Sequence, residues 1–175
     1  MLQDLTVTRE ARTVVDVARH DTFAAGLVLA DAALRAGRCD VEELLQVLAD
    51  CAGWPGIRKA TAVVAHADPR AETPLESLSR AGMIICRIPL PELQQWLTGA
   101  DGKSYRTDFL WRKHRLIGES DGRIKYASPE ALWLEKQRQD ALHRVGYRFV
   151  RWGWREAVNP FISLHPLIMS ALRAA

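Results

Sequence analysis

The sequence predicts an α/β (α+β) protein, in which a helical N-terminal region (residues 1–70) precedes a domain (residues 71–175) with a mixed sheet flanked by helices. Apolar residues recur at helical spacing through the first region. Short segments rich in aromatic and β-branched residues are concentrated in the second. Of the 175 residues, 48 % are hydrophobic and 26 % are charged, which is typical of a soluble globular protein.

Four helices are expected in the first region. Gly37 is a suitable C-terminal stop for the second of them, and Asp40 is a plausible N-cap for the third. The helical segments lie within residues 9–20, 21–37, 39–56 and 57–68. This region is Ala-rich and carries no catalytic grouping, so we interpret it as a helical bundle or cap.

The second region should contain a helix, three strands, a helix, a strand and a final helix. Its first helix begins at a capping box in which Thr73 caps, Pro74 starts the helix and Glu76 follows at the third position. A second helix runs from Pro129 to Gly146. Strand-length segments occupy residues 93–99, 105–111, 114–120 and 147–152. A three-strand meander followed by a helical crossover gives a mixed sheet.

Four tryptophans accompany these elements, and each lies in an apolar segment. They are Trp111, Trp133, Trp152 and Trp154. We expect them in the core, although stacking on bases is the alternative.

Several classes of protein are disfavoured. No apolar run approaches the ~18 residues of a membrane span, and the N-terminus lacks a basic-then-apolar signal pattern. Cys39, Cys51 and Cys86 are odd in number and widely spaced, which indicates a reduced, cytoplasmic protein with no membrane association. No Cys/His cluster suggests zinc.

The net charge of +3 is unevenly distributed. Residues 1–100 hold 10 Lys/Arg and 13 Asp/Glu, a net charge of −3, whereas residues 101–160 hold 13 and 8, a net charge of +5. The basic excess suits an anionic partner such as nucleic acid, and DNA is the partner we favour. A solvated basic surface is the alternative.

Three acids fall on or beside two neighbouring strands. Asp108 interrupts the apolar run of one strand, and Glu119 and Asp121 end the next, pointing to the same face because side chains alternate. Unpaired carboxylates held together are unfavourable, and a divalent cation relieves this. Oxygen ligands suit Mg²⁺ or Mn²⁺, which can activate water. On the residues alone, a solvated Asp108 and a polar turn at 119–122 remain the alternative.

The ordered motifs of residues 72–155 resemble the PD-(D/E)XK nuclease superfamily, and within it the very-short-patch-repair (Vsr-like) endonucleases. Glu76 in ETPLESLSR matches the acid of the leading helix, and PELQ (residues 91–94) matches the entry to the first strand. Asp108 in YRTDFLW matches the central metal-binding aspartate. IGESDGRIKY matches the next strand, and EKQRQDALHRVGYRFVRWGW matches the closing helix and strand. The resemblance implies a restriction-endonuclease-like sheet.

The resemblance also implies a metal-dependent endonuclease that hydrolyses DNA. Asp108, Glu119 and Asp121 would bind Mg²⁺ or Mn²⁺, and Glu76 would complete the coordination through water. The usual third motif is Glu-x-Lys, but Asp121 stands where the lysine is expected. Asp121 is then a third metal ligand or a general base, or else the site has lost activity. Lys125, four residues further on, or Lys136 on the following helix is the candidate to replace the lysine.

Further cations are candidates for binding the nucleic acid. Lys136 and Arg138 lie on the helix after the third strand, and Arg151 lies in the last strand. An arginine facing the site could hold a phosphate bidentately. The alternative for Glu135 and Arg138, three residues apart, is an ordinary ion pair on the helix surface.

The first region resembles the helical segment of actinobacterial relatives of AbiEi-type antitoxins. Those relatives usually carry an N-terminal winged helix, for which the eleven residues before Arg12 leave no room. The alternative function is therefore a catalytically inactive nuclease-fold module of a toxin–antitoxin or defence system. Such a module would act by binding a partner protein or nucleic acid. The sequence favours no oligomeric state.

Overall fold

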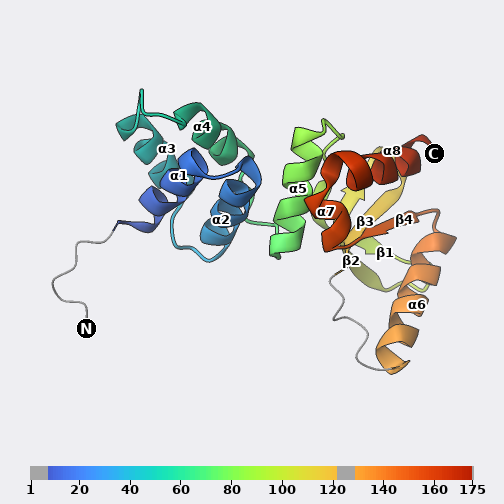
Figure 1. The fold of residues 1–175 in the computed structure, drawn as a ribbon. Coiled ribbons are helices and arrows are strands. Elements are labelled where there is room, and N and C mark those ends of the chain that lie inside the picture. The colour runs from blue at the N-terminus through green and yellow to red at the C-terminus, as the bar shows by residue number, and fades with distance from the viewer. Residues whose placement is uncertain (1–7, 122–128, 175) are drawn as a thin grey trace. The chain divides into compact units, whose positions relative to one another are not determined.

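The computed structural model describes residues 8–121 and 129–174 of the chain. The chain forms two compact units, Met1–Ser77 and Leu78–Ala175. Helices come first, and a four-stranded mixed sheet flanked by helices follows, so the predicted fold class is confirmed (Figure 1). The division between the two units falls within α5 (Pro74–Ile85). The predicted domain boundary after residue 70 stays a prediction.

The N-terminal unit contains the four expected helices. They are α1 (Glu10–His20), α2 (Phe23–Arg35), α3 (Val41–Asp50) and α4 (Ile57–His66). Their apolar faces form one core that includes Val14, Val15, Ala30, Leu44 and Val63. Asp40 caps α3 as predicted. Its carboxylate accepts from the backbone N–H of Glu43 at 2.8 Å, and the carboxylate of Glu43 accepts from the backbone N–H of Asp40 at 3.1 Å.

The C-terminal unit is built on a sheet with the order β1-β2-β3-β4. The strands are β1 (Glu92–Thr98), β2 (Ser104–Trp111), β3 (Leu116–Ser120) and β4 (Arg148–Trp152). The first three strands pair antiparallel, and β4 pairs parallel with β3. A parallel neighbour needs a crossover, and α6 (Pro129–Arg144) lies in this connection.

Helices cover both faces of the sheet. Leu142 of α6 packs against Leu97, Leu110 and Ile117, so α6 covers the face to which these side chains point. The opposite face carries Trp152, whose indole N–H donates to Ser79 of α5 at 2.7 Å. The remaining helices are a 3₁₀ turn (Arg112–His114), α7 (Trp154–Val158), a π-helix (Pro160–Leu164) and α8 (His165–Arg173).

Gly118 of β3 lies beneath two tryptophan rings. A Cβ at this position would meet Trp152 Cη2 at 2.7 Å and Trp111 Cζ3 at 2.9 Å. Both rings are buried, and both indole N–H groups are satisfied, that of Trp111 by the carbonyl of Pro89 at 2.6 Å. A side chain at position 118 would therefore force β3 or the two tryptophan rings to move.

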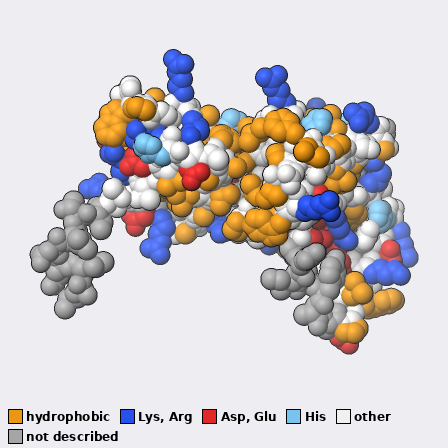
Figure 2. All heavy atoms as spheres, in the orientation of Figure 1, with side chains coloured by type: hydrophobic (Ala, Val, Ile, Leu, Met, Phe, Trp, Pro, Cys, Tyr) orange, Lys and Arg blue, Asp and Glu red, His pale blue; other side chains and the backbone are white. Residues whose placement is uncertain are grey.

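The prediction of buried tryptophans is confirmed for Trp111 and Trp152 and is wrong for the other two. Trp133 on α6 is 59 % exposed, and Trp154 on α7 is 50 % exposed. Trp133 lies between Leu132 and Leu134, which are also exposed, and hydrophobic side chains gather at this end of α6 in Figure 2. Successive residues of a helix point in different directions, so these three cannot all face the sheet. An apolar segment of sequence therefore did not mean that Trp133 is buried.

We expect Ser79→Ala to lower the free energy of unfolding by about 1–3 kcal/mol, because the buried indole N–H of Trp152 loses its acceptor. Urea denaturation would measure this change. Ser170→Ala, at an exposed position of α8, is the matched control and should not destabilise the protein. Equal effects of the two substitutions would show that the hydrogen bond contributes nothing.

No helix within residues 8–121 and 129–174 has both the length and the apolar character needed to cross a membrane.

Candidate functional site

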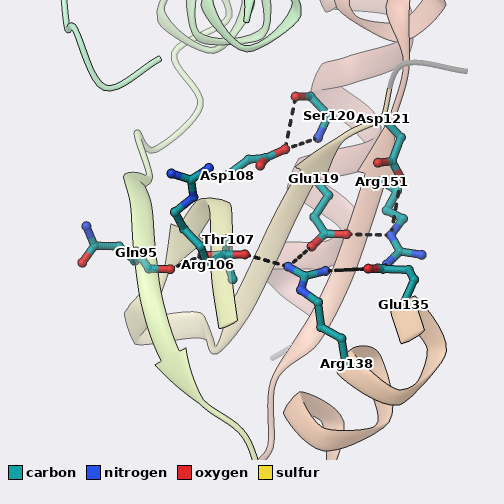
Figure 3. Close-up of polar contacts among 10 residues, drawn as sticks. All are labelled: Gln95, Arg106, Thr107, Asp108, Glu119, Ser120, Asp121, Glu135, Arg138 and Arg151. Atoms are coloured by element: carbon teal, nitrogen blue, oxygen red, sulfur yellow. Dashed lines mark hydrogen bonds and ion pairs between the residues drawn. The ribbon is translucent and has the colours of Figure 1, made fainter. Parts of the chain in front are cut away.

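The three acids singled out by the sequence line one cavity of the C-terminal unit, with a volume of about 510 Å³. Asp108 comes from β2, Glu119 from β3, and Asp121 directly follows β3. The opposite wall is formed by α6, through residues that include Glu135 and Arg138. Figure 3 shows Glu119, Glu135, Arg138 and Arg151 close together beside α6, with the Asp108 carboxylate turned toward Ser120. The structure therefore brings Asp108, Glu119 and Asp121 to a single site.

Strand pairing accounts for this convergence. Phe109 pairs with Gly118, so the residues beside them, Asp108 and Glu119, lie close across the β2–β3 ladder. The Asp108 carboxylate accepts a hydrogen bond from the backbone N–H of Ser120 at 3.1 Å and a longer one, 3.4 Å, from its hydroxyl. The N–H of Asp121 donates to the carbonyl of Trp152 at 2.9 Å, which prolongs the β3–β4 ladder to the third acid.

Glu119 is buried and paired with two arginines. The residue is 5 % exposed. Its Oε1 lies 2.5 Å from Arg138 Nη2, and its Oε2 accepts from Arg151 Nε at 2.9 Å. Arg151 is the partner of Glu119 in the parallel β3–β4 register, whereas Arg138 comes from α6. Each oxygen of this buried carboxylate therefore has its own guanidinium partner.

Glu135 of α6 is a second acceptor for both arginines. Its Oε1 accepts from Arg151 Nη2 at 2.5 Å and from Arg138 Nη1 at 3.1 Å. Asp121 Oδ2 lies 3.6 Å from Arg151 Nε, a weaker ion pair. We refer to Glu119, Asp121, Glu135, Arg138 and Arg151 as the arginine–carboxylate cluster.

Three further contacts fix the arginines. Arg138 Nη2 donates to the backbone carbonyl of Arg106 on β2 at 2.9 Å. The ring of Phe149 lies 5.5 Å from the guanidinium carbon of Arg151 and 6.0 Å from that of Arg138, within range of a cation–π interaction. The cluster is thus tied to β2, β4 and α6.

Both arginines remain charged. Burial acts to lower the pKa of Arg138, but its hydrogen bond to Glu119 and the charges of Glu119 and Glu135 outweigh this, so the pKa is raised above its ordinary value. For Arg151, burial is likewise outweighed, here by the charge and hydrogen bond of Glu119 and the charges of Glu135 and Asp121, and its pKa is also raised. Loss of a proton therefore offers no way of breaking these pairs.

The described residues around the cavity carry more negative than positive charge. Asp108, Glu119, Asp121 and Glu135 supply four carboxylates, which face Lys103 and Arg138 in the cavity lining and the adjoining Arg151. The balance of these seven residues is −1. Such a cavity attracts a cation and repels a phosphate that arrives without one.

The cavity fits a divalent metal in the kind of donor it offers. Carboxylate oxygens and excess negative charge suit Mg²⁺ or Mn²⁺. Within the described parts of the chain, no three His, Cys, Asp or Glu side chains are grouped closely enough to hold a metal ion as they stand. Glu119 would therefore have to exchange an arginine for the metal.

The described lining of the cavity does not include Glu76 or Lys136. Glu76 belongs to the N-terminal unit, where its carboxylate accepts from the hydroxyl of Thr73 and the N–H of Glu72, both at 2.9 Å, in the expected capping box. Its role in metal coordination stays a prediction. Lys125 lies outside the described residues. Lys136 is exposed on α6, and it is not among the described residues that line the cavity.

Helix α6 contributes more of the cavity wall than the sequence predicted. Ala131, Leu134, Glu135 and Arg138 all line the cavity and recur at i, i+3, i+4 and i+7, which is one face of a helix. This spacing is visible in the sequence, and it could have predicted that one face of α6 lines the cavity. The interpretation of Glu135 and Arg138 as an ordinary ion pair on the helix surface is wrong, because Arg138 also binds the buried Glu119.

The relatives that comparison with known proteins identifies are uncharacterized proteins. No protein-family model and no solved structure matches the chain. Two uncharacterized proteins, from two strains of Mycobacterium tuberculosis, are each 37 % identical to it over 143 residues. The match covers 82 % of this chain and 53 % of each relative, so the chain spans about half the length of the curated relatives it matches.

Proposed function

We propose that the protein is a metal-dependent endonuclease of the Vsr-like PD-(D/E)XK type that hydrolyses phosphodiester bonds in DNA. The observation that carries this proposal is the meeting of Asp108, Glu119 and Asp121 in one cavity with excess negative charge. Two adjacent strands deliver these acids, and the β4 and α6 that follow supply the cations around them.

In this proposal Asp108, Glu119 and Asp121 hold Mg²⁺ or Mn²⁺. When bound, the metal supplies polarisation of the phosphate and a lowered pKa for a coordinated water. Asp121, which stands where a lysine was expected, serves as a third ligand or accepts the proton of the attacking water.

The overall charge of this part of the sequence supports a nucleic-acid substrate. Residues 101–160 carry a net charge of +5 even though they contain the three acids. Lys136, exposed on α6, is proposed to contact the DNA backbone, and Arg138 and Arg151 to reach a phosphate once one is bound. We place this activity in the cytoplasm, because Cys39, Cys51 and Cys86 are all free thiols.

The proposal is tested with the full chain and supercoiled plasmid DNA. Nicking is expected in Mn²⁺ and in Mg²⁺ and should stop when a chelator is added. A linear DNA duplex and an RNA of the same sequence, treated in parallel, would identify the substrate. Intact plasmid after incubation with a molar excess of protein in either metal would contradict the proposal.

The pairing of Glu119 favours a second candidate function. Both of its oxygens already have guanidinium partners, so the buried charge is balanced without a metal. This suits a catalytically inactive nuclease-fold module of a toxin–antitoxin or defence system, which binds a partner protein or nucleic acid. Calorimetric titration with Mn²⁺ separates the two functions. Binding that Asp108→Asn abolishes supports the enzyme, and no heat of binding supports the inactive module.

A further inference from the structure

Both oxygens of Glu119 are held by groups that a metal would have to displace. Arg138 Nη2 lies 2.5 Å from Oε1, and Arg151 Nε lies 2.9 Å from Oε2. Mg²⁺ approaches a carboxylate oxygen to about 2.0–2.1 Å. A guanidinium and a divalent cation on the same oxygen repel each other strongly in a buried site, so one must leave when the other binds.

We infer that Arg138 is a positioning residue that competes with the metal for Glu119, and that Glu135 receives Arg138 when the metal binds. This inference rests on the proposed function, because it concerns the same three acids. A guanidinium stays protonated in proteins, so the competition ends by a change of partner and not by loss of charge.

Glu135 is already placed to take over Arg138. Arg138 Nη1 lies 3.1 Å and 3.3 Å from the two oxygens of Glu135, while Nη2 of the same guanidinium contacts Glu119. Turning away from Glu119 therefore leaves Arg138 with a carboxylate partner. A half-buried cation left without a partner would be strongly unfavourable, and Glu135 removes that penalty.

Arg138 and its second partner belong to the same helix. Glu135 and Arg138 are three residues apart on α6, whereas Glu119 is fixed in β3 by the strands on either side. The exchange thus needs a side-chain rotation on the α6 wall, which also breaks the bond from Arg138 Nη2 to the carbonyl of Arg106. Arg151 comes from β4 and also contacts Glu135, so it too keeps an acceptor.

The competition weakens the apparent affinity for the metal. If Arg138 leaves Glu119 accessible in about one molecule in ten, the apparent dissociation constant rises about tenfold. Charge alone would have a different effect, because any cation that lines the cavity would weaken metal binding. The two causes are separable, because Lys103 lines the same cavity and has no ion pair with Glu119 among the described contacts.

The test is Mn²⁺ binding to the full chain, measured by calorimetry and by electron paramagnetic resonance of free Mn²⁺. Arg138→Lys keeps the charge but cannot bridge Glu119 and Glu135, and we expect it to tighten Mn²⁺ binding several-fold, up to about tenfold. Arg138→Gln should tighten binding at least as much. Lys103→Arg and Lys103→Gln are the matched controls, and Lys103→Arg should leave the affinity unchanged.

The outcomes separate this inference from the proposed function. Mn²⁺ binding that depends on Asp108 but is unchanged by Arg138→Lys would overturn the competition and leave the metal site standing. A second contrary result is that Arg138→Gln and Lys103→Gln tighten Mn²⁺ binding equally while Arg138→Lys has no effect. The change in affinity would then come from charge alone, and the competition would be overturned as well. No Mn²⁺ binding by the unmodified chain or by any variant would overturn both. Circular dichroism of each variant establishes that it is folded.

Discussion

Asp108→Asn should reduce Mn²⁺-dependent plasmid nicking about 100-fold or more, because a metal ligand that contributes several kcal/mol to the transition state is lost. The protein itself should remain folded. The Asp108 carboxylate accepts from the N–H of Ser120, and the carbonyl oxygen of an asparagine can accept the same bond. The loss of nicking would therefore report on metal chemistry and not on unfolding.

The control for this result is Asp140→Asn. Asp140 is an exposed acid on α6 that is not among the described residues lining the 510 Å³ cavity. The control should nick plasmid at the rate of the unmodified protein. It shows how much of any change in rate comes from losing one negative charge. If Asp108→Asn nicks as fast as the control, the activity does not arise from this cavity.

Glu119→Gln removes a proposed metal ligand and, unlike Asp108→Asn, should also destabilise the protein by about 3 kcal/mol. Glu119 is buried and binds Arg138 and Arg151, one on each oxygen. A glutamine of the same shape offers one acceptor oxygen, and its NH₂ group would face the donor of the other arginine. The substitution would leave two partly buried cations with insufficient compensation. Urea denaturation measures the change.

Glu92→Gln is the matched control for Glu119→Gln. Glu92 also binds an arginine, with Arg112 Nη2 at 2.8 Å, but both side chains are well exposed, at 45 % and 52 %. An exposed ion pair contributes little to stability, so this control should unfold almost like the unmodified protein. Similar destabilisation by the two substitutions would show that burial of Glu119 is not the cause.

Much of the fold could be predicted from local sequence. Helical spacing, the capping residues Asp40 and Thr73, and alternation in the strand segments are short-range signals, and the structure follows them. The approach of Asp108 to Glu119 was also predictable, since adjacent antiparallel strands bring their side chains to one face.

The arginine–carboxylate cluster could not be predicted in the same way. Glu119 and Arg151 are 32 residues apart, and their contact depends on the parallel register of β3 and β4. The contact of Arg138 with Glu119 depends on how α6 packs on the sheet, which local spacing does not specify. Exposure of Trp133 has the same origin, because a helix turns only one side toward the sheet.

The pairing of Glu119 with Arg151 also has a consequence for how the sheet assembles. Side chains alternate along a strand, so a slip of β4 by one residue would move Arg151 to the opposite face. Glu119 would then lose a partner, and Trp152 would leave the face on which its indole reaches Ser79. A one-residue shift of β4 would therefore lose one contact on each face of the sheet. These two contacts favour the observed register over the shifted one.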